Sequence, residues 1–256
     1  MQTEAWLVPP DVPVLQPGEI HVWRASLTCP PETYDRFWRL LSADERARAE
    51  RLISADRRAQ LIAVRGILRA LLGGYLGQDP GTLSFGAGPQ GKPMLLSDRN
   101  PTRNLRFNLS HSHEHVLYAF AWGREVGIDV ERIREHVDVL KLAERFFAPH
   151  EASALRERSP EERRRLFFTL WVCREACLKA WGTGLTFPLD RLEVELIPEQ
   201  SSARVTIKKP GVETRSCHVR LLPLDGGYVG AVTAEGEESP LQCWQWAEPE
   251  GPDSMR

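Results

Sequence analysis

Two carboxylates on one predicted strand are the residues in this sequence most suited to chemistry. The run from Glu125 to Arg132 alternates apolar and polar residues, so Asp129 and Glu131 project from one face of a strand, roughly 7 Å apart. Acidic residues are depleted in strands, and two like charges on one face repel each other. A hard divalent cation such as Mg²⁺ between them would explain the pair. An exposed edge strand with two surface acids would explain it equally well.

A second group of candidates lies on a predicted helix over residues 160–181. Trp171, Glu175 and Lys179 recur at four-residue spacing on one side of this helix. An exposed Glu–Lys pair is the ordinary explanation of such spacing. Apolar residues on the other sides, however, indicate that the helix is covered on more than one side. Glu175 would then lie in a cleft, where a carboxylate becomes a better proton acceptor.

Two short polar segments could bind phosphate. Ser110, His111 and Ser112 offer compact hydrogen-bond donors, whereas Gly91 and Lys92 combine a permissive backbone with a point charge. Each of these signals is weak by itself, because short segments of this kind are common in loops.

The elements that would position these residues run from helices into strands twice. A capping box, formed by Ser42 and Glu45, begins a basic helical stretch, and a leucine-rich helix after it is expected to end near Gly73 and Gly74. Strands are predicted over 19–27, 105–109, 116–122, 126–130, 192–196, 203–207, 217–222 and 228–233, and further helices over 139–147 and 160–181.

This order of elements predicts an α+β fold, a pseudo-dimer of two similar lobes. We expect an N-terminal lobe over residues 1–123 and a C-terminal lobe over 124–235 that carries the metal ligands. Residues 236–256 are acidic and are expected to trail off the fold as a flexible tail.

Composition limits the classes of function. The chain has 256 residues, 42% of them hydrophobic, and a net charge of −2, so no global field attracts nucleic acid or a membrane surface. Nine arginines against four acids between Arg36 and Arg69 could form a local anion site or a solvated helix face. Five scattered cysteines, with no pattern of a signal peptide or membrane span, predict a reduced cytoplasmic enzyme.

Four blocks of the sequence resemble, in order, those of the 4′-phosphopantetheinyl transferases of the surfactin-synthetase-activating (Sfp) type. They are Gly91-Lys-Pro93, Phe107-Asn-Leu-Ser-His-Ser112, Gly127-Ile-Asp-Val-Glu131, and Trp171 to Ala180 with Gly182-Thr-Gly-Leu185. The resemblance runs from about Ser42 to Val232. The last two blocks together are specific, whereas the first two mean little alone.

The resemblance implies an enzyme that moves the phosphopantetheine arm of coenzyme A to a serine of an apo acyl or peptidyl carrier protein, releasing adenosine 3′,5′-bisphosphate. The coenzyme would bind where the two lobes meet. Asp129, Glu131 and Glu175 would hold Mg²⁺ with the diphosphate. Glu175 would also be the catalytic base, with Asp129 and Lys179 as the other catalytic residues. The natural carrier, whether of fatty-acid, polyketide or nonribosomal-peptide synthesis, is not legible from the sequence, and we expect a monomer.

The resemblance also implies which residues bind the coenzyme. They are Arg48, Lys92, Ser110, His111 and Lys179, with Arg57, Arg58 and Arg65 as unranked helpers. Two positions depart from the family pattern: Arg174 stands where a lysine is usual, and Glu45 stands where some relatives carry a lysine.

Two other functions compete with this one. His111, His113 and His115 alternate and would share one face of a strand, as in a zinc-dependent hydrolase, although no further ligand cluster follows them. A non-catalytic relative that binds a carrier protein or coenzyme A is the other competitor. The complete set of three acids and Lys179 argues against that second function.

Overall fold

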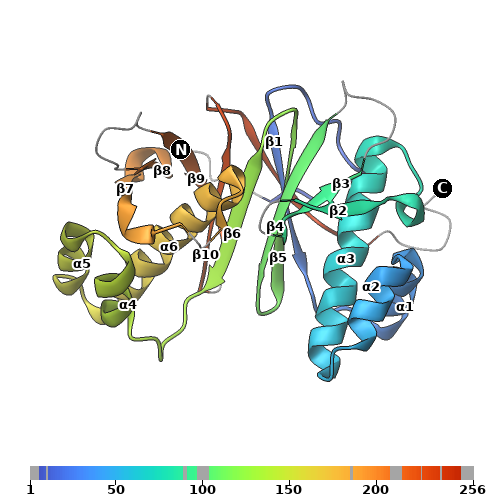
Figure 1. Ribbon diagram of the computed structural model, residues 1–256, viewed down its shortest axis with the longest axis horizontal. Helices are drawn as coiled ribbons and strands as arrows, with labels where there is room; N and C mark the ends of the chain where they lie inside the picture. The colour runs from blue at the N-terminus through green and yellow to red at the C-terminus, as the bar shows by residue number, and fades with distance from the viewer. Residues whose placement is uncertain are drawn as a thin grey trace.

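The computed structural model describes residues 6–9, 11–88, 91–96, 104–184, 187–207, 215–225, 227–236 and 238–248. Two sheets lie against each other in the middle of the molecule, and each has helices on its outer side (Figure 1). The predicted α+β class, built as two lobes of this kind, is confirmed. Buried apolar side chains fill the space between the sheets and the space between each sheet and its helices.

The N-terminal lobe is a four-stranded sheet in the order β11-β1-β5-β4. Its strands are β1 (Ile20–Ser26), β4 (Leu105–Ser112), β5 (His115–Trp122) and β11 (Leu241–Gln245). Its helices are α1 (Pro31–Leu40), α2 (Ala43–Glu50) and α3 (Ala55–Leu76), and a small hairpin pairs β2 (Phe85–Ala87) with β3 (Pro93–Leu95).

The helix ends predicted for this lobe agree only partly with the structure. The capping box at the start of α2 forms as predicted, with Ser42 and Glu45 exchanging hydrogen bonds. Helix α3, however, runs past Gly73 and Gly74 and ends at Leu76, and Gly77, with a φ of 62°, is its left-handed cap. By length and composition α3 could cross a membrane, yet just over half of its most apolar stretch is buried inside this lobe. It is the core helix of the lobe.

The C-terminal lobe is a five-stranded sheet in the order β6-β10-β9-β8-β7. Its strands are β6 (Val126–Arg132), β7 (Leu192–Ile197), β8 (Ser202–Ile207), β9 (Ser216–Leu221) and β10 (Tyr228–Ala234). Helices α4 (Val139–Phe146), α5 (Pro149–Arg156) and α6 (Pro160–Trp181) cover its outer side.

The alternation predicted for β6 decides which way its polar face points. Val126, Ile128 and Val130 are buried in the core between the two sheets, together with Leu117 and Ala119 of β5. Successive side chains of a strand point to opposite faces, so Gly127, Asp129 and Glu131 face α6. The strand thus divides a packed core from a polar junction.

The prediction of a flexible tail is wrong for residues 238–248. Leu241 and Cys243 are buried, and β11 pairs in parallel with β1 at the edge of the N-terminal sheet. Glu248 accepts hydrogen bonds from Thr33 and Arg36 of α1. The prediction relied on the acidic composition of this segment and overlooked the short alternation of apolar residues in β11, the strand that completes the first sheet. Residues 249–256 of the predicted tail lie outside the described residues.

Candidate active site

Helix α6 lies directly against β6 at Gly127. A Cβ atom at this position would stand 2.0 Å from the carbonyl oxygen of Ala176 and 2.5 Å from the backbone nitrogen of Ala180. Only glycine permits this approach of helix backbone to strand backbone. The close contact brings Glu175 and Lys179 of α6 beside the carboxylates of β6.

Asp129 is held by two donors at a single oxygen. The Lys179 ammonium donates to Asp129 Oδ1 at 2.7 Å and to the carbonyl oxygen of Ile128 at 3.1 Å. The hydroxyl of Ser110 donates to the same Oδ1, also at 2.7 Å. Asp129 Oδ2, by contrast, is buried and has no hydrogen-bond partner. A buried carboxylate oxygen without a partner is costly, so Oδ2 could accept a hydrogen bond or a cation from a ligand.

Strands β4 and β6 belong to different lobes and are joined by side chains. The Asn108 side-chain oxygen accepts a hydrogen bond from the backbone nitrogen of Ile128 at 3.0 Å. Ser112 Oγ donates to Glu131 Oε2 at 2.9 Å. Ser110, expected beside a phosphate, instead has the carboxylate of Asp129 as its partner. The junction of the lobes and the polar site are therefore the same place.

Glu175 has the properties expected of a proton acceptor. Burial, and next the Asp129 carboxylate, raise the pKa of Glu175 to about 7, against the opposing influence of the Lys179 ammonium. Its Oε1 is buried without a hydrogen-bond partner. A carboxyl group with a pKa near neutrality can accept a proton at physiological pH. Glu175 is thus half-buried rather than in open water, and its role as a base stays a prediction.

The third carboxylate, Glu131, is partly exposed at the end of β6. Burial raises its pKa and the hydrogen bond from Ser112 lowers it, while the Asp129 charge raises it further. The carboxylates of Asp129, Glu131 and Glu175 thus repel one another electrostatically. Among the described residues, though, no three His, Cys, Asp or Glu side chains are already arranged to hold a metal ion. Lys179 supplies the positive charge beside Asp129.

The three alternating histidines do not share a face of one strand. His111 lies on β4, one residue before the strand ends. His113 lies in the turn that follows, with a φ of 53°. His115 is the first residue of β5, and its ring contacts that of Tyr228. The expectation of a single strand was wrong because the turn interrupts it. Desolvation, followed by the Lys179 charge, lowers the pKa of His111, so its imidazole is neutral at pH 7.

Lys92 joins three segments of the protein. Its ammonium donates to Glu125 Oε2 at 2.8 Å and to the carbonyl oxygens of Val126 and Lys179, each at 3.0 Å. An ammonium group has three donors, and all three are used here. The expected phosphate contact of Lys92 would require at least one of these bonds to break. Through these hydrogen bonds Lys92, which directly precedes β3, connects the β2–β3 hairpin to the start of β6 and to the end of α6.

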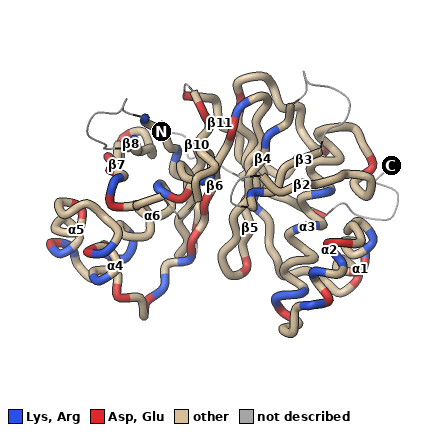
Figure 2. Tube along the Cα trace, in the orientation of Figure 1, with Lys and Arg blue, Asp and Glu red and all other residues tan. Residues whose placement is uncertain are grey.

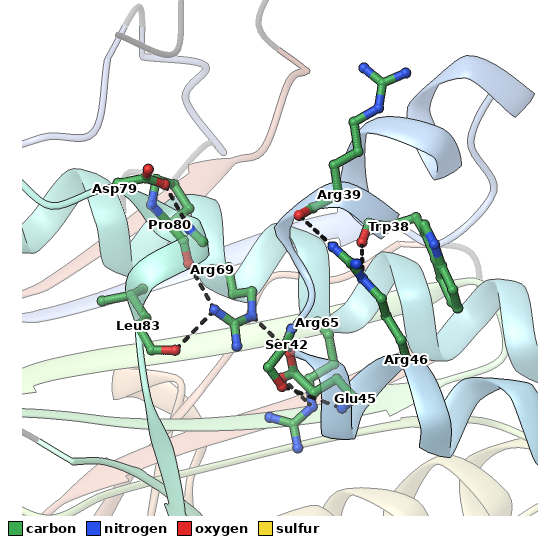
Figure 3. Close-up of polar contacts among 11 residues, drawn as sticks. Trp38, Arg39, Ser42, Glu45, Arg46, Arg65, Arg69, Asp79, Pro80 and Leu83 are labelled. Atoms are coloured by element: carbon green, nitrogen blue, oxygen red, sulfur yellow. Dashed lines mark hydrogen bonds and ion pairs between the residues drawn. The ribbon is translucent and has the colours of Figure 1, made fainter.

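The basic cluster on α2 and α3 explains the departure at Glu45. Glu45 Oε2 accepts a hydrogen bond from Arg69 Nε at 2.8 Å, and Glu45 Oε1 lies 3.6 Å from Arg65 Nε (Figure 3). Arg69 also donates to the carbonyl oxygens of Pro80 and Leu83. Glu45 therefore neutralises the buried Arg69 and the half-buried Arg65, and it also caps α2.

The other predicted coenzyme-binding arginines lie on the same two helices, whose basic positions are drawn in blue in Figure 2. Arg48 and Arg57 are exposed, whereas Arg58 donates to the carbonyl oxygen of Leu52. Burial chiefly, with a smaller contribution from Arg48, lowers the pKa of Arg65. Among the described contacts, none joins these arginines to the carboxylates of β6 and α6. Their role toward a coenzyme stays a prediction.

Arg174, the second departure, is a buried structural residue. Its guanidinium forms an ion pair with Glu151, donates to the carbonyl oxygens of Leu170 and Leu192, and lies over the Phe147 ring. Arg174 and Glu151 are both almost completely inaccessible to solvent. The side chain points into the core behind α6, so a phosphate contact at this position is excluded.

A pocket of about 270 Å³ lies between the β2–β3 hairpin, the start of β4 and the end of α6. Lys92 and Glu125 line it, as do Phe107 and Trp181. Glu125 directly precedes β6, and Asp129 and Glu131 lie roughly 13 Å and 20 Å farther along the chain by the rise of a strand. An extended ligand could reach from the carboxylates to this pocket.

Two family models match consecutive parts of the chain. The 4′-phosphopantetheinyl transferase superfamily matches residues 125–233, and the N-terminal region of a 4′-phosphopantetheinyl transferase matches residues 23–122. The 4′-phosphopantetheinyl transferase HetI of Nostoc sp. is 41% identical over 200 residues, which are 78% of this chain and 84% of the relative. The chain belongs to the 4′-phosphopantetheinyl transferase family. The predicted family and the predicted class of enzyme are confirmed.

More distant relatives agree. A putative 4′-phosphopantetheinyl transferase of Synechocystis sp. is 33% identical over 223 residues, covering 87% of this chain and 80% of the relative. The 4′-phosphopantetheinyl transferase Sfp of Bacillus subtilis is 28% identical over 209 residues, covering 82% and 88%. As a phosphopantetheinyl transferase, the protein uses coenzyme A and acts on carrier proteins; neither the zinc hydrolase nor the non-catalytic relative is supported.

Proposed function

We propose that this transferase carries out its reaction where β4, β6 and α6 meet, with Glu175 as the base and with Asp129, Glu131 and Glu175 as Mg²⁺ ligands. One observation carries the proposal. Asp129 Oδ2 and Glu175 Oε1 are both buried and unpartnered at the point where Lys179 already binds Asp129. Two open carboxylate oxygens beside an ammonium group suit a ligand that brings both a cation and phosphate oxygens.

The donor chemistry of the site fits magnesium. Mg²⁺ prefers carboxylate and phosphate oxygens and usually takes only one or two protein carboxylates, keeping other positions for substrate phosphates and water. The protein need not form a closed cage, so Mg²⁺ binding here does not require a ready-made cluster of three ligands, and none is found among the described residues. When bound, Mg²⁺ would neutralise negative charge that develops on the diphosphate.

The side chains divide the remaining tasks. The hydroxyl oxygen of the carrier serine attacks the phosphorus next to the pantetheine arm, and Glu175 accepts the proton of that hydroxyl. A new bond forms between that oxygen and the phosphorus, and the bond from the phosphorus to the bisphosphate oxygen breaks. Lys179 stabilises the charge on the departing adenosine 3′,5′-bisphosphate, and the neutral imidazole of His111 can donate a hydrogen bond to a phosphate oxygen. No covalent enzyme intermediate is required, because positioning and electrostatics suffice for phosphoryl transfer.

The protein substrate can be described by its chemistry, although not by name. The substrate protein is an apo acyl or peptidyl carrier with a reactive serine, of fatty-acid, polyketide or nonribosomal-peptide synthesis. A monomeric state and a cytoplasmic location stay predictions.

The test is a mass-shift assay. Purified protein with Mg²⁺, coenzyme A and an apo carrier should yield carrier heavier by one phosphopantetheine arm, and a chelator should stop the reaction until Mg²⁺ is restored. Asp129→Ala and Glu175→Ala should abolish turnover while circular dichroism stays unchanged. Glu195→Ala, on an exposed position of β7, is the matched control and should retain turnover. Undiminished turnover in either site variant would refute the role given to that residue, and turnover in excess chelator would refute the metal.

A further inference from the structure

Three polar side chains at alternate positions of β4 contact β6 across the junction of the lobes. Asn108 binds the backbone, Ser110 binds Asp129, and Ser112 binds Glu131. All three residues are largely buried. Their spacing of two residues is that of one strand face, so the row continues from the backbone contact to both acids of β6.

Ser112 has a defined direction of hydrogen bonding. The backbone nitrogen of Arg132 donates to Ser112 Oγ at 3.1 Å. A backbone N–H can only donate, so Oγ is the acceptor of that bond and its own proton is free for Glu131 Oε2 at 2.9 Å. The hydroxyl is therefore anchored to the backbone of β6 and oriented toward the carboxylate one residue before the anchor.

Glu131 depends on this hydroxyl more than Asp129 depends on Ser110. Asp129 Oδ1 receives both Ser110 and Lys179. Among the described residues, the Ser112 hydroxyl is the only hydrogen-bond donor to Glu131. The nearest cation, Arg134, stands at 3.9 Å with about half of its side chain exposed. Exposed ion pairs at such a distance contribute little.

We infer that Ser112 is a positioning residue of the transfer reaction. It holds the Glu131 carboxylate by Oε2 and thereby directs the other oxygen, Oε1, toward the cation shared with Asp129. The inference rests on the proposed function. It assigns Ser112 a task distinct from binding the coenzyme, because its one proton is already committed to the protein.

The experiment compares Ser112→Ala with Ser112→Thr in the complete enzyme. Ser112→Ala removes the donor, and Ser112→Thr keeps it. Ser202→Ala removes a buried hydroxyl of β8, remote from the site, and is the matched control. For each protein we would measure turnover at limiting Mg²⁺ and, separately, titrate Mn²⁺ onto the protein with coenzyme A by electron paramagnetic resonance.

The expected result is selective. Ser112→Ala should raise the half-saturating Mg²⁺ concentration and the Mn²⁺ dissociation constant about tenfold, as loss of a hydrogen bond to a charged group does. Ser112→Thr and Ser202→Ala should stay within about twofold of the unsubstituted protein, a change below half a kcal/mol. In a Glu131→Gln background, Ser112→Ala should add no further loss, because Ser112 acts through Glu131.

Contrary results separate the two ideas. If the unsubstituted protein neither binds Mn²⁺ with coenzyme A nor modifies carrier, the proposed function falls before any variant is compared. If it does both and Ser112→Ala matches it in metal affinity, the positioning role of Ser112 is wrong. Equal losses in the presence and absence of the Glu131 carboxylate would likewise overturn it.

Discussion

Replacing the proposed base should stabilise the metal-free protein while destroying its activity. Glu175→Gln keeps the size of the side chain and removes the charge. Burial and the neighbouring acids raise the pKa of Glu175 from 4.5 to about 7. A group with a raised folded-state pKa favours folding below its unfolded pKa and loses that contribution as the pH rises through the folded value. Above pH 7 the ionised Glu175 therefore strains the folded protein.

The size of the effect follows from the shift. Each pKa unit corresponds to about 1.4 kcal/mol, so Glu175→Gln should raise the free energy of unfolding by about 3 kcal/mol at pH 8. For a chain of this length the melting temperature would rise by roughly 6–12 °C. Near pH 4.5, where the native carboxyl is protonated, the two proteins should differ by less than about 0.5 kcal/mol.

The assay is urea unfolding of both proteins in EDTA at pH 4.5 and pH 8. Glu195→Gln, at an exposed position of β7, is the control and should change stability by less than about 0.5 kcal/mol at either pH. Adding Mg²⁺ and coenzyme A at pH 8 should reverse the order, because only the native carboxylate binds the cation. If Glu175→Gln is no more stable than the native protein at pH 8 in EDTA, the account of Glu175 as a strained, buried acid is wrong.

Three further substitutions test the parts of the structure that position the site. Gly127→Ala would force its Cβ against the backbone of α6, so we expect a loss of about 3 kcal/mol in chemical denaturation and loss of carrier modification. Arg174→Met should cost about 3–5 kcal/mol because it leaves Glu151 buried and unpaired, and adding Glu151→Gln should recover much of that loss in a thermal melt. Lys92→Met should lower the stability of the coenzyme-free protein by about 2 kcal/mol if Lys92 is a tether; a change confined to the KM for coenzyme A would instead support a phosphate contact.

Periodicity was a sound guide where one face of an element was buried. The helix over 160–181 and the start of β6 at Val126 were predicted to the residue, because their apolar positions pack against cores. Helices α1 and α5 were missed: each is short and begins at a proline, and its stability comes from the lobe on which it packs. Strand β11 was missed because only its pairing with β1 gives its few apolar residues a role.

The candidate site shows the same division. Asp129, Glu131, Glu175 and Lys179 could be chosen from their spacing and from the family resemblance. Ser112 could have been weighed more heavily from its place two residues after Ser110, since equal spacing puts both hydroxyls on one face. The ion-pair and hydrogen-bond partners of the charged residues could not be predicted from the sequence. Long side chains such as Lys92 can turn to several neighbours, and the neighbour is chosen by which strand or helix lies beside them.

Most of the order of helices and strands, the α+β class and the choice of candidate acids could be predicted from the sequence alone, because they depend on local periodicity and on short motifs. Tertiary structure decided which oxygens stay open. Asp129 Oδ2 and Glu175 Oε1 are buried without partners where α6 packs against β6 at Gly127. It also showed that the two departures, half-buried Glu45 and fully buried Arg174, form ion pairs within the protein. Hydrogen bonds and charge interactions act over a few ångströms, so residues far apart in the chain acquire them only when the fold brings them together.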